Sequence, residues 1–109
     1  MLEHVSPRER IRDRFRRGDF RLSKHATKQM GLRGRTLEEE RRTIIAGEII
    51  REYPREQPYP EFLFLGYPAQ PDDPCYVVVA SNDETVIVTV HNYDAEVYEA
   101  NHRTRRKRP

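Results

Sequence analysis

The stretch CYVVVASNDETVIVTVH, residues 75–91, decides the fold. Both of its halves are rich in β-branched residues, which strands prefer. The polar SNDE at residues 81–84 is typical of a turn, so the pattern predicts a β-hairpin. Because both halves are almost continuously apolar, we expect central strands that helices cover on at least one face.

Upstream of the hairpin, the same signals predict two more strands. Residues 48–53 form one candidate, which Pro54 stops, and residues 62–67 form the other after a Pro-rich connection. A short strand at residues 20–22 is also allowed, because apolar and charged residues alternate there.

The first third of the chain carries helix signals instead. Ser6 followed by Pro7 predicts a capped helix over residues 7–17, which Gly18 ends. Its apolar stripe consists only of Ile11 and Phe15. We therefore expect this basic helix to dock weakly or to contact a partner.

Two further helices are predicted before the first long strand. Ser23 is expected to cap a helix over residues 24–30 that ends at Gly31. Thr36 opens a third helix with a capping box, and Gly47 ends it. The residues expected on the inner face of this third helix are Leu37, Ile44 and Ile45.

These elements predict one α+β domain, with helices at its N-terminal end and an antiparallel sheet at its C-terminal end. A length of 109 residues suits a single domain. We place the core at about residues 19–100, the basic helix at 7–17 and a basic tail at 102–109, with a short helical turn near 95–100.

The charges are segregated along the chain. Residues 7–35 carry eleven Lys or Arg and three acids, residues 36–101 carry four Arg and fourteen acids, and residues 102–109 carry five Lys or Arg. Such a split can steer a polyanion toward one face of a protein. A solvated helix with a frayed tail explains the same pattern. In the two basic segments, residues 7–35 and 102–109, we predict that nucleic acid is contacted by Arg14, Arg17, Arg105 and Arg106.

Several classes of protein are not expected. No apolar run is long enough for a membrane helix, and the N-terminus lacks the apolar region of a secretory signal. The single Cys75 suggests a reducing compartment, so we expect a cytoplasmic protein. The four His and Cys75 do not have metal-site spacing, and no phosphate-binding or dinucleotide-binding loop is present. We therefore predict neither a metal nor a small-molecule cofactor.

His25 is the most informative candidate for chemistry. With Ser23 as cap, it is the second residue of its helix, beside free backbone N–H groups that can hold a phosphate. We expect the helix dipole, Lys24 and Lys28 to disfavour the charged ring, and a neutral imidazole can act as a general base. The alternative is a ring that packs on the sheet and hydrogen-bonds a loop.

A second group of candidates lies near the end of the last strand. Alternation places Thr89, His91 and Tyr93 on one face, which is either a reactive surface or an ordinary solvent-facing strand end. Arg33 and Arg35 flank a turn and can grip a phosphate in bidentate fashion, or else belong to a solvated loop.

An ordered set of motifs resembles a known family. The motifs are LSKHA (22–26), MGLRGRT (30–36), GEIIREYP (47–54), FLFLG (62–66), YVVVA (76–80) and VIVTV (86–90). Over about residues 20–94 they resemble the prokaryotic family catalogued as domain of unknown function 4258. This family is usually grouped with the RelE-like and colicin-like ribonucleases. The resemblance therefore implies N-terminal helices packed on a roughly four-stranded, mostly antiparallel curved sheet.

The resemblance also implies a metal-independent activity on RNA and often an antitoxin partner. It gives His25 a candidate active-site role and Arg33 a supporting role. The family commonly has His at the position of Tyr76 and Tyr at the position of His91. This exchange between neighbouring strands either preserves the chemistry or marks a member that has lost it.

The first hypothesis is therefore a toxin-type endoribonuclease that cleaves RNA through its 2′-hydroxyl by acid–base catalysis. One imidazole would accept the 2′-hydroxyl proton, and the other group or a Tyr would protonate the leaving 5′-oxygen. The alternatives are a non-catalytic module that binds nucleic acid and one that binds protein. The predicted catalytic residues are His25, His91, Arg33 and Tyr76, and the predicted RNA contacts are Lys24, Lys28, Arg35, Arg14, Arg17, Arg105 and Arg106.

Overall fold

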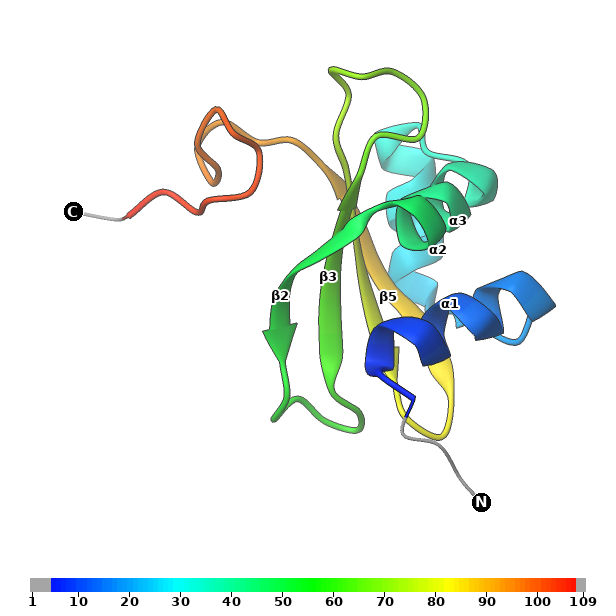
Figure 1. The fold of residues 1–109 in the computed structure, drawn as a ribbon. Helices are drawn as coiled ribbons and strands as arrows, with labels where there is room; N and C mark the ends of the chain where they lie inside the picture. Colours follow the sequence, from blue (N-terminus) through cyan, green and yellow to red (C-terminus); the bar gives the residue numbers. More distant parts are fainter. Residues whose placement is uncertain (1–4, 108–109) are drawn as a thin grey trace.

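One five-stranded sheet carries three helices on one of its faces (Figure 1). The computed structural model describes residues 5–107. In chain order the elements are α1 (Pro7–Arg17), β1 (Arg21–Leu22), α2 (Lys24–Arg33), α3 (Leu37–Ala46), β2 (Glu48–Tyr53), β3 (Glu61–Gly66), β4 (Cys75–Ser81) and β5 (Thr85–Asn92). The predicted α+β class is confirmed. No helix within residues 5–107 is long and apolar enough to cross a membrane.

The strand order is β1-β5-β4-β3-β2, so the hairpin of β4 and β5 lies near the middle, as expected. The four longer strands pair antiparallel, and the short β1 adds a fifth strand that pairs parallel with β5. The register of the hairpin shifts by one residue, because Val78 faces Thr89 whereas Val79 faces Ile87. Beyond this bulge Tyr76 lies opposite His91.

The two faces of the sheet bury different residues. The helix-covered face comprises Ile11, Phe15, Ala26, Ile44, Phe62, Phe64, Cys75, Val77, Val79, Ile87 and Val90. The opposite face, which we call the aromatic face, buries Leu63, Leu65, Tyr76 and Tyr98, with Ile50, Tyr53, Val78, Tyr93 and Val97 packed against them. Cys75 is buried on the helix-covered face.

Helix α1 docks more firmly than its narrow apolar stripe suggested. Ile11 and Phe15 are fully buried, and arginines beside them bond to backbone oxygens. Arg12 donates to the carbonyls of Ile44 and Gly47, where the C-terminus of α3 leaves acceptors unpaired. Long side chains can anchor a helix in this way because their heads carry several donors. Much of the basic character of α1 therefore serves its docking.

Helix α2 is longer than predicted. It continues through Gly31 to Arg33, and Gly34 ends it in the left-handed conformation with φ of 66°. Glycine suits that conformation because it has no Cβ. Gly31 was an incorrect stop signal, since an exposed glycine within a helix costs only about 1 kcal/mol relative to alanine. The extra turn carries Arg33 to the end of β5, where its backbone oxygen accepts a hydrogen bond from Asn92.

Helix α3 begins at its capping box, as predicted, but its inner face differs. The buried residues are Glu40, Thr43 and Ile44, whereas Leu37 is exposed and Ile45 only half-buried. The prediction is confirmed for Ile44 and wrong for Leu37 and Ile45, because the helix ends directly against β3 with Glu40 and Thr43 facing inward. A Cβ at Gly47 would overlap the carbonyl oxygens of Thr43 and Leu65, so only glycine allows so close an approach.

The segment after β5 forms an ordered loop, which we call the C-terminal loop (residues 93–107). It contains one helical turn, in which Tyr98 N donates to Asp94 O, close to the turn expected near residues 95–100. Tyr98 then pairs with Arg105 and inserts its ring into the aromatic face. Figure 1 shows this loop on the side of the sheet away from the helices. The part of the basic tail at residues 108–109 lies outside the described residues.

Candidate functional site

Three stacked rings form the centre of the site. Tyr76 of β4 lies parallel to His91 of β5, with ring centroids 4.7 Å apart, and it also stacks on Tyr98 at 4.5 Å. The Nε2 of His91 hydrogen-bonds the hydroxyl of Tyr98 at 3.2 Å. The hydroxyl of Tyr76 donates to the backbone oxygen of His102 at 2.5 Å. The orientation of the His91 ring is therefore set by one stacking partner and one hydrogen bond.

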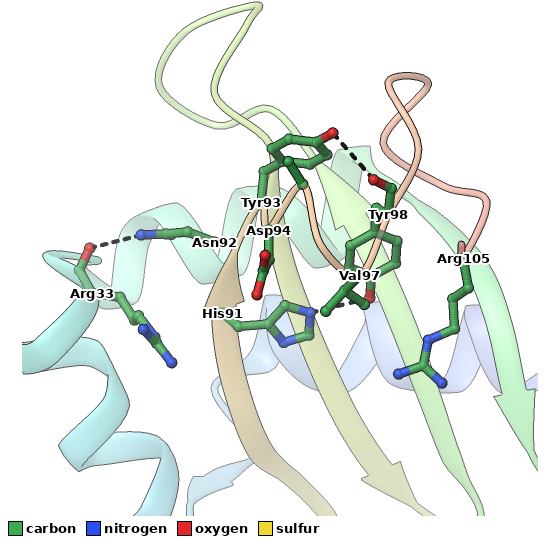
Figure 2. A pocket seen from close by; sticks show the side chains of 9 residues that line it. Arg33, His91, Asn92, Tyr93, Asp94, Val97, Tyr98 and Arg105 are labelled. Carbon is green, nitrogen blue, oxygen red and sulfur yellow. Dashed lines mark hydrogen bonds between the residues drawn. The ribbon is translucent and has the colours of Figure 1, made fainter. Parts of the chain in front are cut away.

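His91 lines a cavity of about 440 Å³, which we call the His91 pocket. Its walls are Arg33, residues 91–95, Val97, Tyr98 and Arg105. Figure 2 shows Arg33 and Arg105 on opposite sides of the imidazole, one from the end of α2 and one from the C-terminal loop. Neither guanidinium forms an ion pair with an acid among residues 5–107. The pocket is therefore suited to an anion.

The electrostatics of the pocket keep His91 uncharged. Burial, together with the positive charges of Arg33 and Arg105, lowers the pKa of His91 to about 4, and Asp94 opposes this only in part. The ring is accordingly neutral near pH 7 and can accept a proton. An anion seated between the two guanidinium groups would offset their positive charge and raise the pKa of His91.

His25 occupies the predicted helical position. It is the second residue of α2, and the Ser23 side chain accepts a hydrogen bond from Ala26 N as a cap should. Its ring is exposed, and Nε2 hydrogen-bonds Thr89 Oγ1 at 3.1 Å. The hydrogen bond therefore joins the ring to a strand residue, whereas the alternative interpretation expected a loop.

His25 and His91 approach the same face of the sheet. Thr89 lies opposite Val78 and His91 opposite Tyr76, and directly opposed residues point to one face. Two residues along a strand span about 6.6 Å. His25 hydrogen-bonds Thr89, two residues before His91 on β5, but neither His25 nor Thr89 lines the His91 pocket.

Arg33 and Arg35 serve different purposes. Arg33 is exposed and lines the His91 pocket. Arg35 is buried, with bonds from both terminal nitrogens to Asp73, from Nε to Asn92 and from Nη2 to the carbonyl of Pro74. Its donors are already engaged, so we leave Arg35 out of the proposed site.

The other predicted residues divide into those near the pocket and those far from it. Arg105 lines the pocket, and Lys24 and Lys28 lie exposed on α2, the helix that carries His25. Arg106 donates through Nε to Ala95 O within the C-terminal loop. Tyr76 is fully buried, which makes it a support for His91 and keeps it from direct contact with a ligand.

The two predicted residues of α1 are not part of this cluster. Arg14 donates to Asn82 O and to Thr85 Oγ1 at the hairpin turn, the end of β5 opposite the pocket. Arg17 pairs with Asp13 on the surface of α1. The basic helix and the pocket therefore do not form one continuous basic surface.

Tyr98 and Asp94 also belong to the site, although neither was among the site residues predicted from the sequence. Tyr98 supplies the hydroxyl that holds His91, and Asp94 supplies the acid of the pocket. Neither lies in a periodic element or a recognisable motif, and only the return of the C-terminal loop over the sheet brings them to His91. Among residues 5–107, no group of three or more His, Cys, Asp or Glu is arranged to hold a metal ion.

Comparison with known proteins identifies one family. A family model described as "Domain of unknown function (DUF4258)" matches residues 22–91, more than half of the chain. The match begins in β1 and ends at His91, so it contains both imidazoles of the site but not the C-terminal loop. No curated protein matches the chain, and no solved structure does.

Proposed function

This chain belongs to the domain of unknown function 4258 family, and we propose that it is a metal-independent endoribonuclease of the toxin type. The observation that carries the proposal is an uncharged His91 in a pocket between two guanidinium groups, with a second imidazole, His25, on the same face. The likeness to RelE-like ribonucleases belongs to this proposal and is consistent with the helix-covered, mostly antiparallel sheet.

In this proposal His91 acts as the general base. Its Nε2 is engaged with Tyr98, which leaves Nδ1 free for the substrate. Nδ1 accepts the proton of the ribose 2′-hydroxyl while the 2′-oxygen forms a bond to phosphorus. The bond from phosphorus to the 5′-oxygen then breaks, and that oxygen receives a proton. The products are a 2′,3′-cyclic phosphate and a 5′-hydroxyl, so no metal or external nucleophile is required.

Two groups can supply the proton to the leaving oxygen. His25 is the second imidazole on this face, and the Tyr98 hydroxyl lies on the opposite side of the His91 ring from the free Nδ1. Each acid or base group typically contributes about 10²–10⁴-fold to the rate. Arg33 and Arg105 stabilise the charge that develops on the phosphate, which is worth about 3–4 kcal/mol for a well-placed donor.

The exchange of Tyr and His relative to the family pattern is consistent with this role. Tyr76 and His91 are directly opposed in register and stacked, so an imidazole at either position lies in the same small region. The double variant Tyr76→His with His91→Tyr should therefore retain part of the activity, whereas His91→Tyr alone should abolish it. Equal activity of the single and double variants would argue against a shared site.

The direct test uses purified protein and single-stranded and structured RNA in EDTA. We expect cleavage that leaves 2′,3′-cyclic phosphate ends, no cleavage of DNA, and a loss of about 10²–10⁴-fold in His91→Ala. His25→Ala and Tyr98→Phe identify the acid, because only one of them should cause a comparable loss. Thermal unfolding of each variant shows that the fold is retained. Absence of cleavage, or cleavage unchanged in His91→Ala, would refute the proposal.

Binding without catalysis is the second candidate, and the unpaired guanidinium groups of Arg33 and Arg105 favour it on their own. It predicts salt-dependent RNA affinity without product formation. The proposal also includes an antitoxin partner, which would keep a ribonuclease inactive, and a reducing cytoplasm, which suits the single Cys75.

A further inference from the structure

A second hollow adjoins the His91 pocket, and we call it the basic groove. Its volume is about 690 Å³, and it lies between residues 48–51 of β2 and residues 103–107 of the C-terminal loop. Five of its nine lining residues are Lys or Arg and one is acidic. β2 is an edge strand of the sheet, so the groove runs along an edge of the aromatic face.

The groove and the pocket share the Arg105 side chain. Arg105 lines both hollows. Arg51 of the groove also lies near Tyr98. Burial raises the pKa of the Tyr98 hydroxyl, and the positive charges of Arg105 and Arg51 both act to lower it. A row of cations therefore runs from Arg33, past His91, through Arg105 to the groove.

Most cations of the groove are free to bind a ligand. Arg103 pairs with Glu48, but no other Lys or Arg of the groove forms an ion pair within residues 5–107. The Nε of Arg51 is enclosed and has no hydrogen-bond partner among these residues. A ligand with acceptor oxygens would satisfy accessible guanidinium and ammonium donors of the groove that the fold leaves unpaired.

We propose that the basic groove binds the single-stranded RNA that flanks the cleaved bond. The phosphate to be cleaved would lie between Arg33 and Arg105 beside His91, and the next phosphates would contact Arg51 and Lys107. This inference rests on the proposed ribonuclease function and adds a substrate class, an extended strand of several nucleotides. Phosphates are favoured over an acidic peptide because the row of cations begins at the imidazole that the chemistry uses.

The test measures binding of oligonucleotides that cannot be cleaved, since 2′-O-methyl RNA lacks the free hydroxyl. The full chain is titrated against fluorescent 2′-O-methyl RNA of two and of eight nucleotides by anisotropy. We expect the longer RNA to bind at least roughly tenfold more tightly at low salt, because it makes more phosphate contacts. The variant Arg51→Gln/Lys107→Gln should bind the longer RNA roughly tenfold more weakly, with a salt slope lower by about 1.4, or 0.7 for each phosphate lost.

Two controls make the result specific. Arg8→Gln/Arg16→Gln removes the same charge from exposed positions of α1 and should leave the affinity for both RNAs unchanged. Lys107→Gln alone changes an exposed side chain and should show about half of the slope change, so the test remains valid if substitution of Arg51 disturbs folding.

The outcomes separate this inference from the proposed function. Equal affinity for the two lengths, or equal losses in the α1 control, would overturn the groove as an RNA site. Displacement of the RNA by octaglutamate at similar concentrations would overturn it in favour of an acidic protein partner. Length-dependent binding without cleavage of ordinary RNA would refute the ribonuclease and leave the groove as an RNA-binding surface.

Discussion

The two faces of the sheet each bury an ionisable group, in different surroundings. On the helix-covered side, Glu40 of α3 is fully buried, and neither carboxyl oxygen has a hydrogen-bond partner among residues 5–107. On the aromatic face, His91 is stacked, hydrogen-bonded to Tyr98 and open to a pocket. Burial raises the pKa of Glu40 to about 7, with help from Glu39, whereas burial and two arginines lower the pKa of His91 to about 4.

The difference supports the proposal that the aromatic face binds the ligand. Both groups favour their neutral forms because charge is costly away from water. Glu40 has no opening to a ligand, so its effect is on stability alone. His91 faces a cavity whose cations a bound anion would neutralise, and in the proposed function its neutral ring accepts a proton. Variants of Glu40 should therefore change stability alone, whereas variants around His91 should also change RNA cleavage.

The largest effect is expected from the two arginines at the end of α2. Arg35→Gln should destabilise the protein by roughly 3 kcal/mol, because it removes a buried group that holds Asp73, Asn92 and Pro74 together. Arg33→Gln should change stability by less than about 0.5 kcal/mol but reduce RNA cleavage by about 10²-fold. Urea unfolding and the cleavage assay measure the two quantities. Equal loss of stability in both variants would show that Arg33 also supports the fold.

The next effect concerns Glu40 and pH. Between about pH 4.5 and 7 the folded protein holds a proton on Glu40 that the unfolded chain has lost, so this group makes stability fall as pH rises. The stability associated with the protonated Glu40 carboxyl is fully present below pH 4.5 and is lost as the pH rises through about 7. A shift of this size corresponds to about 3 kcal/mol.

Glu40→Met should therefore be more stable than the wild type at pH 8, and this gain should shrink by about 3 kcal/mol at pH 4. Urea unfolding at the two pH values gives the comparison. Glu38→Met is a matched control, since Glu38 is exposed on the same helix and its difference from the wild type should vary little with pH. A gain in Glu40→Met that is the same at both pH values would contradict the assigned protonation.

The smallest effect is the opposite pH response of His91. Here the unfolded chain binds the proton between about pH 6.5 and 4, so the stability that a neutral His91 supplies is present above pH 6.5 and lost as pH falls through 4. Relative to His91→Gln, the wild type should lose about 2 kcal/mol over this range, a value reduced because the ring is partly exposed.

Unfolding measured across pH 4–8 joins these two predictions. Between pH 4.5 and 6.5 the contributions of Glu40 and His91 oppose each other, so the wild type should vary little. Glu40→Met should become more stable with rising pH, and His91→Gln less stable. Parallel profiles of stability against pH for the two variants would show that the pKa of Glu40 or of His91 is not shifted as described.

Local signals in the sequence were sufficient for most of the elements. The caps Ser6, Ser23 and Thr36 each begin a helix where predicted, because a capping side chain needs only backbone groups three residues away. The hairpin around residues 81–84 follows in the same way from β-branched runs and a turn. His25 could thus be placed beside the N-terminus of α2 without coordinates.

Contacts between distant segments could not be predicted. Arg35 looked like a phosphate contact beside Arg33, and only the approach of the loop carrying Asp73 shows that it is buried. Tyr98 looked like an ordinary aromatic residue, and only the fold of the C-terminal loop places its hydroxyl on His91. These pairings join residues that no shared periodicity relates.

By itself, the sequence determined the α+β class, the starts of the helices, the central hairpin and the two imidazoles as candidates. The tertiary structure alone decided that His91 is the enclosed one, that Arg33 and Arg105 flank it, and that Arg35, Arg12 and Arg14 support the fold. The physical reason is the distance along the chain over which each effect acts. Caps, turns and periodicity act over a few residues, whereas burial and electrostatics sum over every segment that folds against a group.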